Sequence, residues 1–149
     1  MNSLFDFIVE PCGQRYNNEV KVGDTSLIIN TELDSYKSVN NIGKVISTPL
    51  AYKTSIKSGD LVMIHHNVFR RFYDIKGKEK NSRAYFKNNL YFVQLDQIYL
   101  YKKNNKWQSF GDRCFIAPIK NNDEINASLE QGLIGILKYG NNSLEALGI

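Results

Sequence analysis

Residues 56–64 read Ile-Lys-Ser-Gly-Asp-Leu-Val-Met-Ile, in which a Gly-Asp turn leads into four apolar residues. Glycine and aspartate favour turns, and a short apolar run after a turn indicates a buried strand. Comparable runs lie on both sides of this segment, at Leu4–Glu10, Gly43–Ser47, Leu90–Leu95 and Gln97–Tyr101. The first of them is stopped by Pro11 and Gly13, as expected for a strand that ends in a turn. After the last of them, Asn104 and Asn105 predict another turn, which leads on to Trp107. Together these runs predict a chain that is mostly β, folded as a small β-barrel.

The composition agrees with this fold class. Of the 149 residues, 42% are hydrophobic, with nine Tyr and eight Phe, and aromatic side chains pack well on a pleated sheet. A chain of this length can bury a core without metals or disulfides. We expect a barrel domain over residues 1–103 and a C-terminal extension over residues 104–149.

Nothing in the sequence indicates secretion or membrane insertion. Residues 1–10 lack a positively charged leader with a long apolar run, and no stretch is long enough to cross a bilayer. Without a secretory signal, Cys12 and Cys114 are expected to be reduced thiols in a cytoplasmic protein.

A polar segment over residues 14–41 separates the first strand from the second. It is rich in Asn, Asp, Ser, Thr and Glu, and its polarity is interrupted mainly by Leu27, Ile28 and Ile29. A segment of this composition has little apolar surface to bury, so it is predicted to be a mobile loop that carries an aliphatic triplet. The triplet could also be an ordinary barrel strand, because Leu-Ile-Ile has good strand propensity.

Residues 65–87 alternate aromatic and basic side chains, and they predict a long hairpin with its tip at residues 76–82. The whole stretch from residue 70 to residue 106 holds ten Lys or Arg against three Asp or Glu, whereas the rest of the chain is slightly acidic. Such a basic stretch suits a polyanionic partner, and it also suits a hairpin that keeps its lysines in water.

From Gly111 the sequence pattern starts again. Cys114–Pro118 matches Phe7–Pro11, and Gly135–Lys138 matches the glycine-led strand that begins at Gly43. The extension is therefore a possible partial repeat of the N-terminal strands, although short apolar strands also match by chance.

The order of these elements resembles the GroES family of co-chaperonins, and in particular the divergent members carried by phages. Five elements at compatible spacing carry the resemblance: the opening strand at 6–11, the loop with its triplet, the strand at 43–47, the Gly-Asp strand at 59–64, and the late strands that end at 96–99. The likeness covers residues 4–101 and returns weakly from residue 111.

The resemblance implies a function without catalysis. Members of the family form seven-membered rings that cap a GroEL-type chaperonin, which binds and hydrolyses ATP while an unfolded client protein is enclosed. Carried over to this chain, the chaperonin-binding residues are Leu27, Ile28 and Ile29. The hairpin at 65–87 takes the place of the family's roof hairpin, with Phe69, Arg70, Arg71, Phe72 and Tyr73 at its start. A phage-encoded member would act in the cytoplasm of its bacterial host.

A single-stranded nucleic-acid binder is the rival hypothesis. Aromatic side chains that stack on bases, interleaved with cations that hold phosphates, are what such proteins use. The residues that fit these roles are the aromatics Phe69, Phe72, Tyr73, Tyr85 and Phe86 and the cations Arg70, Arg71, Lys78, Lys80 and Arg83.

Other chemistries find no support in the sequence, so we expect neither a cofactor nor a metal. His65 and His66 are adjacent, and neighbours on a strand would point to opposite faces rather than to one metal. Neither Gly-Asp pair has the spacing or the lysine of a phosphate-binding loop. No Cys-His pair or carboxylate pair is brought together by spacing, and we therefore predict no enzyme activity.

Overall fold

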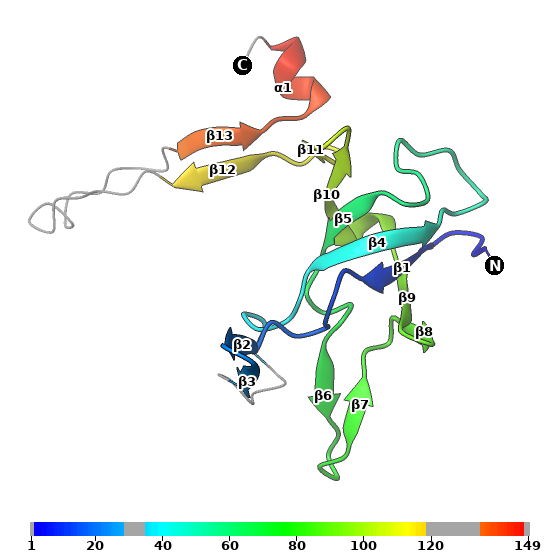
Figure 1. The fold of residues 1–149 in the computed structure, drawn as a ribbon. Helices are drawn as coiled ribbons and strands as arrows, with labels where there is room; N and C mark the ends of the chain where they lie inside the picture. The colour runs from blue at the N-terminus through cyan, green and yellow to red at the C-terminus, as the bar shows by residue number, and fades with distance from the viewer. Residues whose placement is uncertain (1, 29–34, 119–134, 148–149) are drawn as a thin grey trace, which may run out of the picture.

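The computed structural model describes residues 2–28, 35–118 and 135–147, and this part of the chain is mostly β (Figure 1). Its only α-helix is α1 (Asn142–Ala146). The strands are β1 (Phe7–Pro11), β2 (Glu19–Val22), β3 (Thr25–Ile28), β4 (Ile42–Ser47), β5 (Leu61–Ile64), β6 (Arg71–Tyr73), β7 (Glu79–Asn81), β8 (Tyr85–Lys87), β9 (Leu90–Val93), β10 (Ile98–Lys103), β11 (Lys106–Ser109), β12 (Phe115–Pro118) and β13 (Gly135–Tyr139). The prediction of a mostly β chain is confirmed.

Seven of the strands form one antiparallel sheet in the order β11-β10-β5-β4-β1-β9-β8. The two outer strands, β11 and β8, do not pair with each other, so the sheet is open among the described residues. The expected closed barrel is therefore not formed. Register shifts at Ile8/Val9 and at Ile98/Leu100 interrupt the ladders of β1 and β10. Such bulges bend and twist a sheet, which explains its curved outline (Figure 1).

The core lies on one face of this sheet. Along β4 the burial alternates, with Val45 fully buried and its neighbours Lys44 and Ile46 exposed, as expected for a strand with one face in the core. The connecting segments add further buried side chains, including Ile56 and Phe69. The buried cluster contains Phe7, Val9, Tyr16, Val39, Val45, Ile56, Val62, Ile64, Val68, Phe69, Tyr91, Val93, Ile98 and Tyr101.

Gly43 allows β1 and β4 to pack closely. A Cβ atom built on this glycine would overlap Cγ1 of Val9 and would lie 3.2 Å from Cζ of Phe69. Because the core has no room for the extra carbon, we expect Gly43→Ala to lower the free energy of unfolding by about 1–3 kcal/mol. Urea denaturation measures this loss. The neighbouring exposed Lys44 is the control, since Lys44→Ala should stay within about 0.5 kcal/mol of the wild type, and equal stability of the two variants would contradict the tight packing.

Two Asn-Asn turns close hairpins of the main sheet. Asn88 and Asn89 join β8 to β9, and Asn104 and Asn105 join β10 to β11, with positive φ angles of 48° and 63° in each pair. Two consecutive positive φ angles are the signature of a type I′ turn, which matches the twist of paired strands. The predicted turn at 104–105 is confirmed. The boundary predicted after residue 103 falls inside this hairpin, and β11 belongs to the main sheet.

The hairpin predicted over residues 65–87 is shorter in the structure. Only β6 and β7 pair with each other, with the turn at residues 74–78 rather than at 76–82. β8 pairs instead with β9 and closes one edge of the main sheet. The sequence interpretation was wrong here because one aromatic and basic stretch contains strands of two different sheets.

The C-terminal part holds a separate two-stranded sheet, β12–β13, followed by α1 (Figure 1). Asn141 caps this short helix, since its side-chain oxygen accepts a hydrogen bond from the Leu144 N–H at 2.9 Å. Within the described ranges, no helix has the length and hydropathy needed to cross a bilayer.

Candidate partner-binding site

The predicted chaperonin-binding residues lie on a small hairpin formed by β2 and β3. Leu27 and Ile28 are the last two residues of β3, with 52% and 63% of their surface exposed. Ile29 lies outside the described residues. Every residue of both strands is exposed, so this hairpin displays its aliphatic side chains to solvent rather than to the core.

The pairing of β2 with β3 sorts these side chains onto two faces. Val20 lies directly opposite Leu27, so the two share one face, and Val22 joins them two residues along β2. Ile28 lies opposite Glu19 on the other face. A partner that holds both Leu27 and Ile28 must therefore enclose the end of β3 from both sides.

Sequence reasoning missed the two valines. Their signal was the alternation Glu-Val-Lys-Val over residues 19–22, which is the two-residue period of a strand. It also missed the turn, where Gly23 has a φ of 63°. Glycine at the first central position of a two-residue hairpin loop favours a type II′ turn.

A hydrogen-bonded stalk connects this hairpin to the core. Tyr16 and Val39 form an isolated β-bridge, and both are buried in the main cluster. The Asn17 N–H donates to the Ser38 carbonyl at 2.7 Å, and the Asn40 N–H donates to the Arg15 carbonyl at 2.8 Å. The prediction of one mobile loop over residues 14–41 is therefore wrong at both ends, because these ends pair with each other and pack on the sheet.

The buried side chain of Asn40 also fastens the stalk. Its amide group donates to the carbonyls of Cys12 and Gln14 at 3.0 and 2.9 Å, and its oxygen accepts from the Ile42 N–H at 2.9 Å. An asparagine that is satisfied in this way holds the strand entering the loop against the strand leaving it.

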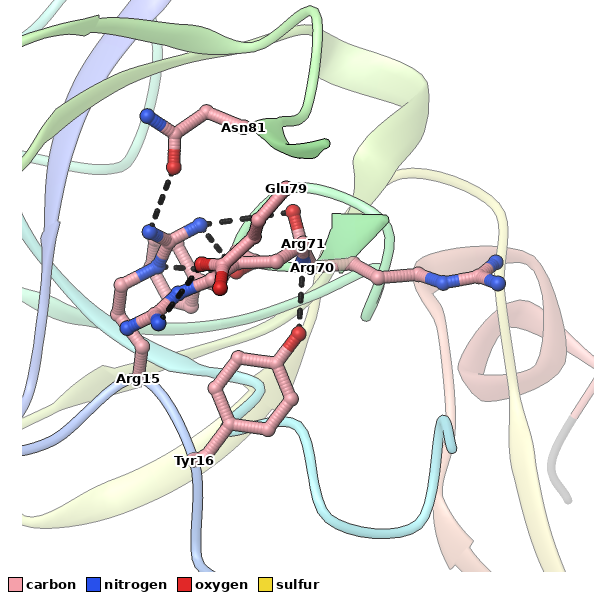
Figure 2. Close-up of polar contacts among 7 residues, drawn as sticks. Arg15, Tyr16, Arg70, Arg71, Glu79 and Asn81 are labelled. Atoms are coloured by element: carbon pink, nitrogen blue, oxygen red, sulfur yellow. Dashed lines mark hydrogen bonds and ion pairs between the residues drawn. The ribbon is translucent and has the colours of Figure 1, made fainter. Parts of the chain in front are cut away.

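Arg15 joins the stalk to the β6–β7 hairpin (Figure 2). Its Nε and Nη2 atoms donate to the Phe69 carbonyl at 3.0 and 2.7 Å, and Nη1 donates to Oδ1 of Asn81 at 2.7 Å. Its guanidinium lies 5.2 Å from the ring centroid of Tyr91, within the range of a cation–π contact. Burial lowers the pKa of Arg15, but an arginine remains charged in proteins.

Tyr16 makes a second link between the same two segments. Its hydroxyl oxygen accepts a hydrogen bond from the Arg71 N–H at 2.7 Å, and the Arg71 guanidinium lies 5.5 Å from the centre of its ring. Arg71 also pairs with Glu79 across the β6–β7 hairpin at 3.0 Å. Figure 2 shows Arg15 and Arg71 side by side in this cluster, whereas the Arg70 side chain points away from it.

Of the aromatic residues predicted for the roof hairpin, one is buried in the core and two are exposed. Phe69 is fully buried and packs edge-on against Tyr91, with ring centroids 4.9 Å apart. It therefore cannot line a chamber or stack on a base. Phe72 and Tyr73 are exposed on β6, so they remain available for a partner.

Asp74 shapes the turn at the end of the β6–β7 hairpin. One of its carboxylate oxygens accepts from the N–H groups of Lys76 and Lys78, each at 2.9 Å, and the other lies 3.2 Å from Nζ of Lys80. The backbone hydrogen bond from Lys78 is the main reason why the pKa of Asp74 is lowered. This ordered turn leaves Ile75 fully exposed at the tip.

The two histidines are not placed as the sequence suggested. His65 and His66 follow the end of β5, and their rings stack with centroids 4.3 Å apart instead of pointing to opposite faces. Tyr36 lies against His66, with ring centroids 5.7 Å apart. Burial, together with the charges of His65 and Arg70, lowers the pKa of His66.

No cluster of three His, Cys, Asp or Glu side chains suited to a metal occurs within the described ranges. Cys12 and Cys114 are both free and exposed.

The candidate site therefore consists of two hairpins joined at their bases: β2–β3, which exposes aliphatic side chains, and β6–β7, which carries basic and aromatic side chains. Comparison of the chain with family models, curated proteins and solved structures finds no match.

Proposed function

We propose that this chain is a GroES-like co-chaperonin that docks on a GroEL-type chaperonin ring through the β2–β3 hairpin. The observation that supports this best is the exposure of Leu27 and Ile28 on a hairpin whose stalk is fixed to the core. Exposed aliphatic side chains on a projecting segment are available to bind an apolar groove. The proposal extends to Ile29, the next residue of the triplet.

The arrangement of the sheet is compatible with the family resemblance. The strands that carry the resemblance, β1, β4, β5, β9 and β10, lie side by side in the order β10-β5-β4-β1-β9. The loop with the aliphatic triplet connects β1 to β4 and leaves this sheet between two neighbouring strands. The aliphatic hairpin therefore projects from the middle strands rather than from a chain end.

Weak single contacts suit a cap that must be released. Burying an aliphatic side chain contributes about 1.5–3 kcal/mol, and each backbone residue that becomes ordered on docking offsets about 1–2 kcal/mol of this. One hairpin is therefore expected to bind weakly. In a homo-heptamer several hairpins engage together, and the effective concentration of the later ones makes the whole contact firm.

In this proposal the chain contributes binding and enclosure and carries no catalytic group. The chaperonin binds and hydrolyses ATP, and the cap closes over an unfolded client protein in the cytoplasm of a bacterial host. The β6–β7 hairpin, which exposes Phe72 on one face and Tyr73 on the other, would serve as the roof hairpin.

Two measurements test the proposal together. Light scattering of the purified chain should give a mass near seven times 17.1 kDa. Size-exclusion chromatography with a GroEL-type ring should show co-elution in the presence of ATP and separate elution without nucleotide. A stable monomer that never co-elutes with the ring would contradict the proposal.

A single-stranded nucleic-acid binder remains the second candidate, because the basic charge gathers beside exposed aromatic rings. Residues 70–83 hold six basic and two acidic side chains, and Tyr73 is exposed among them. Two of the residues assigned to this function are less suited to it. Phe69 is buried and cannot stack on a base, and the Lys80 ammonium group already pairs with Asp74 at 3.2 Å.

Binding of a labelled oligonucleotide separates the two candidates. The co-chaperonin proposal expects at most weak binding that is the same for wild type and Tyr73→Ala. If the hairpin binds nucleic acid, removing the aromatic ring of Tyr73 should instead weaken binding by about 1–3 kcal/mol. The affinity should also fall steeply as salt is added. Fluorescence anisotropy across a salt series measures both effects.

A further inference from the structure

The C-terminal hairpin repeats the geometry of two strands of the main sheet. In β1–β4, Pro11 lies opposite Gly43, and the register then shifts by one residue between Ile8 and Val9. In β12–β13, Pro118 lies opposite Gly135, and the same shift occurs between Phe115 and Ile116. In the β1–β4 pair, the residues opposite each other are Pro11–Gly43, Glu10–Lys44, Val9–Val45 and Ile8–Ser47. In the β12–β13 pair, they are Pro118–Gly135, Ala117–Ile136, Ile116–Leu137 and Phe115–Tyr139.

The glycine contact is also repeated. A Cβ atom on Gly135 would overlap Cγ2 of Ile116, just as one on Gly43 would overlap Cγ1 of Val9. The same Cβ atoms would lie 2.9 Å from the Ala117 carbonyl oxygen and 3.2 Å from that of Glu10. A shared register, a shared bulge and a shared close approach do not follow from the short apolar pattern alone.

The β1–β4 and β12–β13 pairs differ in whether their outer edges are paired with further strands. In the main sheet β9 pairs with the outer edge of β1 and β5 pairs with the outer edge of β4, and Val9 and Val45 are fully buried. Among the described residues, β12 and β13 pair only with each other. Ile116, the counterpart of Val9, is 60% exposed.

The backbone of β4 shows which atoms the free edge of β13 offers. The Val45 N–H donates to the Asp60 carbonyl at 2.9 Å, and the Val45 carbonyl accepts from the Gly59 N–H at 2.7 Å. Both partners belong to the Gly-Asp turn that leads into β5. Leu137 holds the position of Val45 in β13, so its N–H and carbonyl are the groups that an added strand would meet.

We infer that β12–β13 is a second copy of the β1–β4 pair and that it binds an added strand of the β5 type from a second polypeptide. The occupant is an antiparallel segment with a Gly-Asp turn followed by aliphatic residues. It pairs with the outer edge of β13 beside Leu137, as the segment around β5 pairs with the outer edge of β4 beside Val45. This inference does not depend on the proposed chaperonin contact.

A synthetic peptide with the sequence of residues 57–64, Lys-Ser-Gly-Asp-Leu-Val-Met-Ile, is the probe. Added to the intact chain, it should slow hydrogen exchange of the Leu137 amide by about tenfold or more, because a new hydrogen bond and a covered edge both protect that group. Exchange can be followed residue by residue by NMR. A scrambled peptide of the same composition should give no protection.

Matched variants on β13 identify the face that is covered. Leu137→Asp should abolish the protection, now read at the Gly135 amide, which faces the same edge two residues along the strand. Lys138→Asp, on the opposite face, should leave the protection of Leu137 intact. The amides of β1 and β4 in the same samples report whether the main sheet remains folded.

Three results would overturn the inference: no slowing of Leu137 exchange at saturating peptide, equal slowing by the scrambled peptide, or equal loss of protection in both variants. If the Leu137 amide is already protected without peptide and the chain is oligomeric, a second copy of β12–β13 occupies the edge, and the assignment of a β5-type strand is wrong.

Discussion

Replacing Arg15 by methionine is expected to lower the free energy of unfolding by about 2–4 kcal/mol, since all the hydrogen bonds that its charged group donates are lost together. The variant keeps an unbranched apolar stem but leaves the Phe69 carbonyl and the Asn81 side chain without their donor. It also removes the cation from the face of Tyr91. Urea denaturation of both proteins measures the difference.

Arg83 provides the matched control for this substitution. It is an exposed arginine between β7 and β8, so Arg83→Met should change the stability by no more than about 0.5 kcal/mol. If Arg15→Met were equally harmless, the cluster at the base of the two hairpins would contribute nothing to the fold. Faster amide exchange at Asn17 and Asn40 in Arg15→Met would show in addition that the stalk has loosened, because these amides form the ladder beside Arg15.

Ile28→Asp is the second large expected effect, and it acts on partner binding rather than on folding. Ile28 is exposed and lies at the end of a strand that is solvent-exposed throughout, so the free chain should keep its stability. A carboxylate forced into an apolar groove loses the aliphatic contribution and adds a desolvation penalty of a few kcal/mol. Because several hairpins would bind together in the proposed heptamer, we expect capture by a GroEL-type ring to fall below detection.

Leu50→Asp is the control for capture. Leu50 is 64% exposed, which matches the 63% of Ile28, and it follows the opposite end of β4 from the stalk. Capture of this variant should equal that of the wild type in a surface-immobilised ring assay. Undiminished capture of Ile28→Asp would refute the assignment of the hairpin, whereas equal loss in both variants would point to a general effect of added charge.

Local sequence signals sufficed for much of the fold. The Gly-Asp pair at 59–60 followed by Leu61–Ile64 predicted β5, and the Asn-Asn pair at 104–105 predicted a hairpin turn. Both depend on the backbone preferences of a few consecutive residues. Closure of the sheet depends on which distant strands pair, and no short pattern indicates that the edges β8 and β11 remain apart.

In the candidate site, too, the sequence predicted local features but not those that depend on distant residues. The composition around Leu27 and Ile28 predicted their exposure, but it did not predict that Tyr16 and Val39 would be buried. A single apolar residue in a polar segment gives no periodic signal, and its burial here depends on partners far along the chain. Arg15 is a clearer case, because its acceptor on Phe69 lies 54 residues away.

Phe69 illustrates how an aromatic and basic pattern can mislead. It stands directly before Arg70 and Arg71, so by sequence it belongs with the exposed ring of Phe72. In the structure it ends the buried segment that runs into β6, and its ring contacts Tyr91. The change from core to surface occurs within three residues, because Arg70 and Arg71 are half-buried and Phe72 is exposed. Composition averaged over a longer window cannot detect so short a change.

The shared base of the two hairpins has a mechanical consequence. Arg15 and Tyr16 stand at the root of the β2–β3 arm, and they hold the β6–β7 arm by hydrogen bonds to Phe69, Asn81 and Arg71 (Figure 2). Because these hydrogen bonds join the two arms directly, a force applied to β2–β3 is passed on to β6–β7. In the proposed complex, a ring bound to β2–β3 would therefore shift the tip at Ile75, and a dye attached there would report binding at a distance.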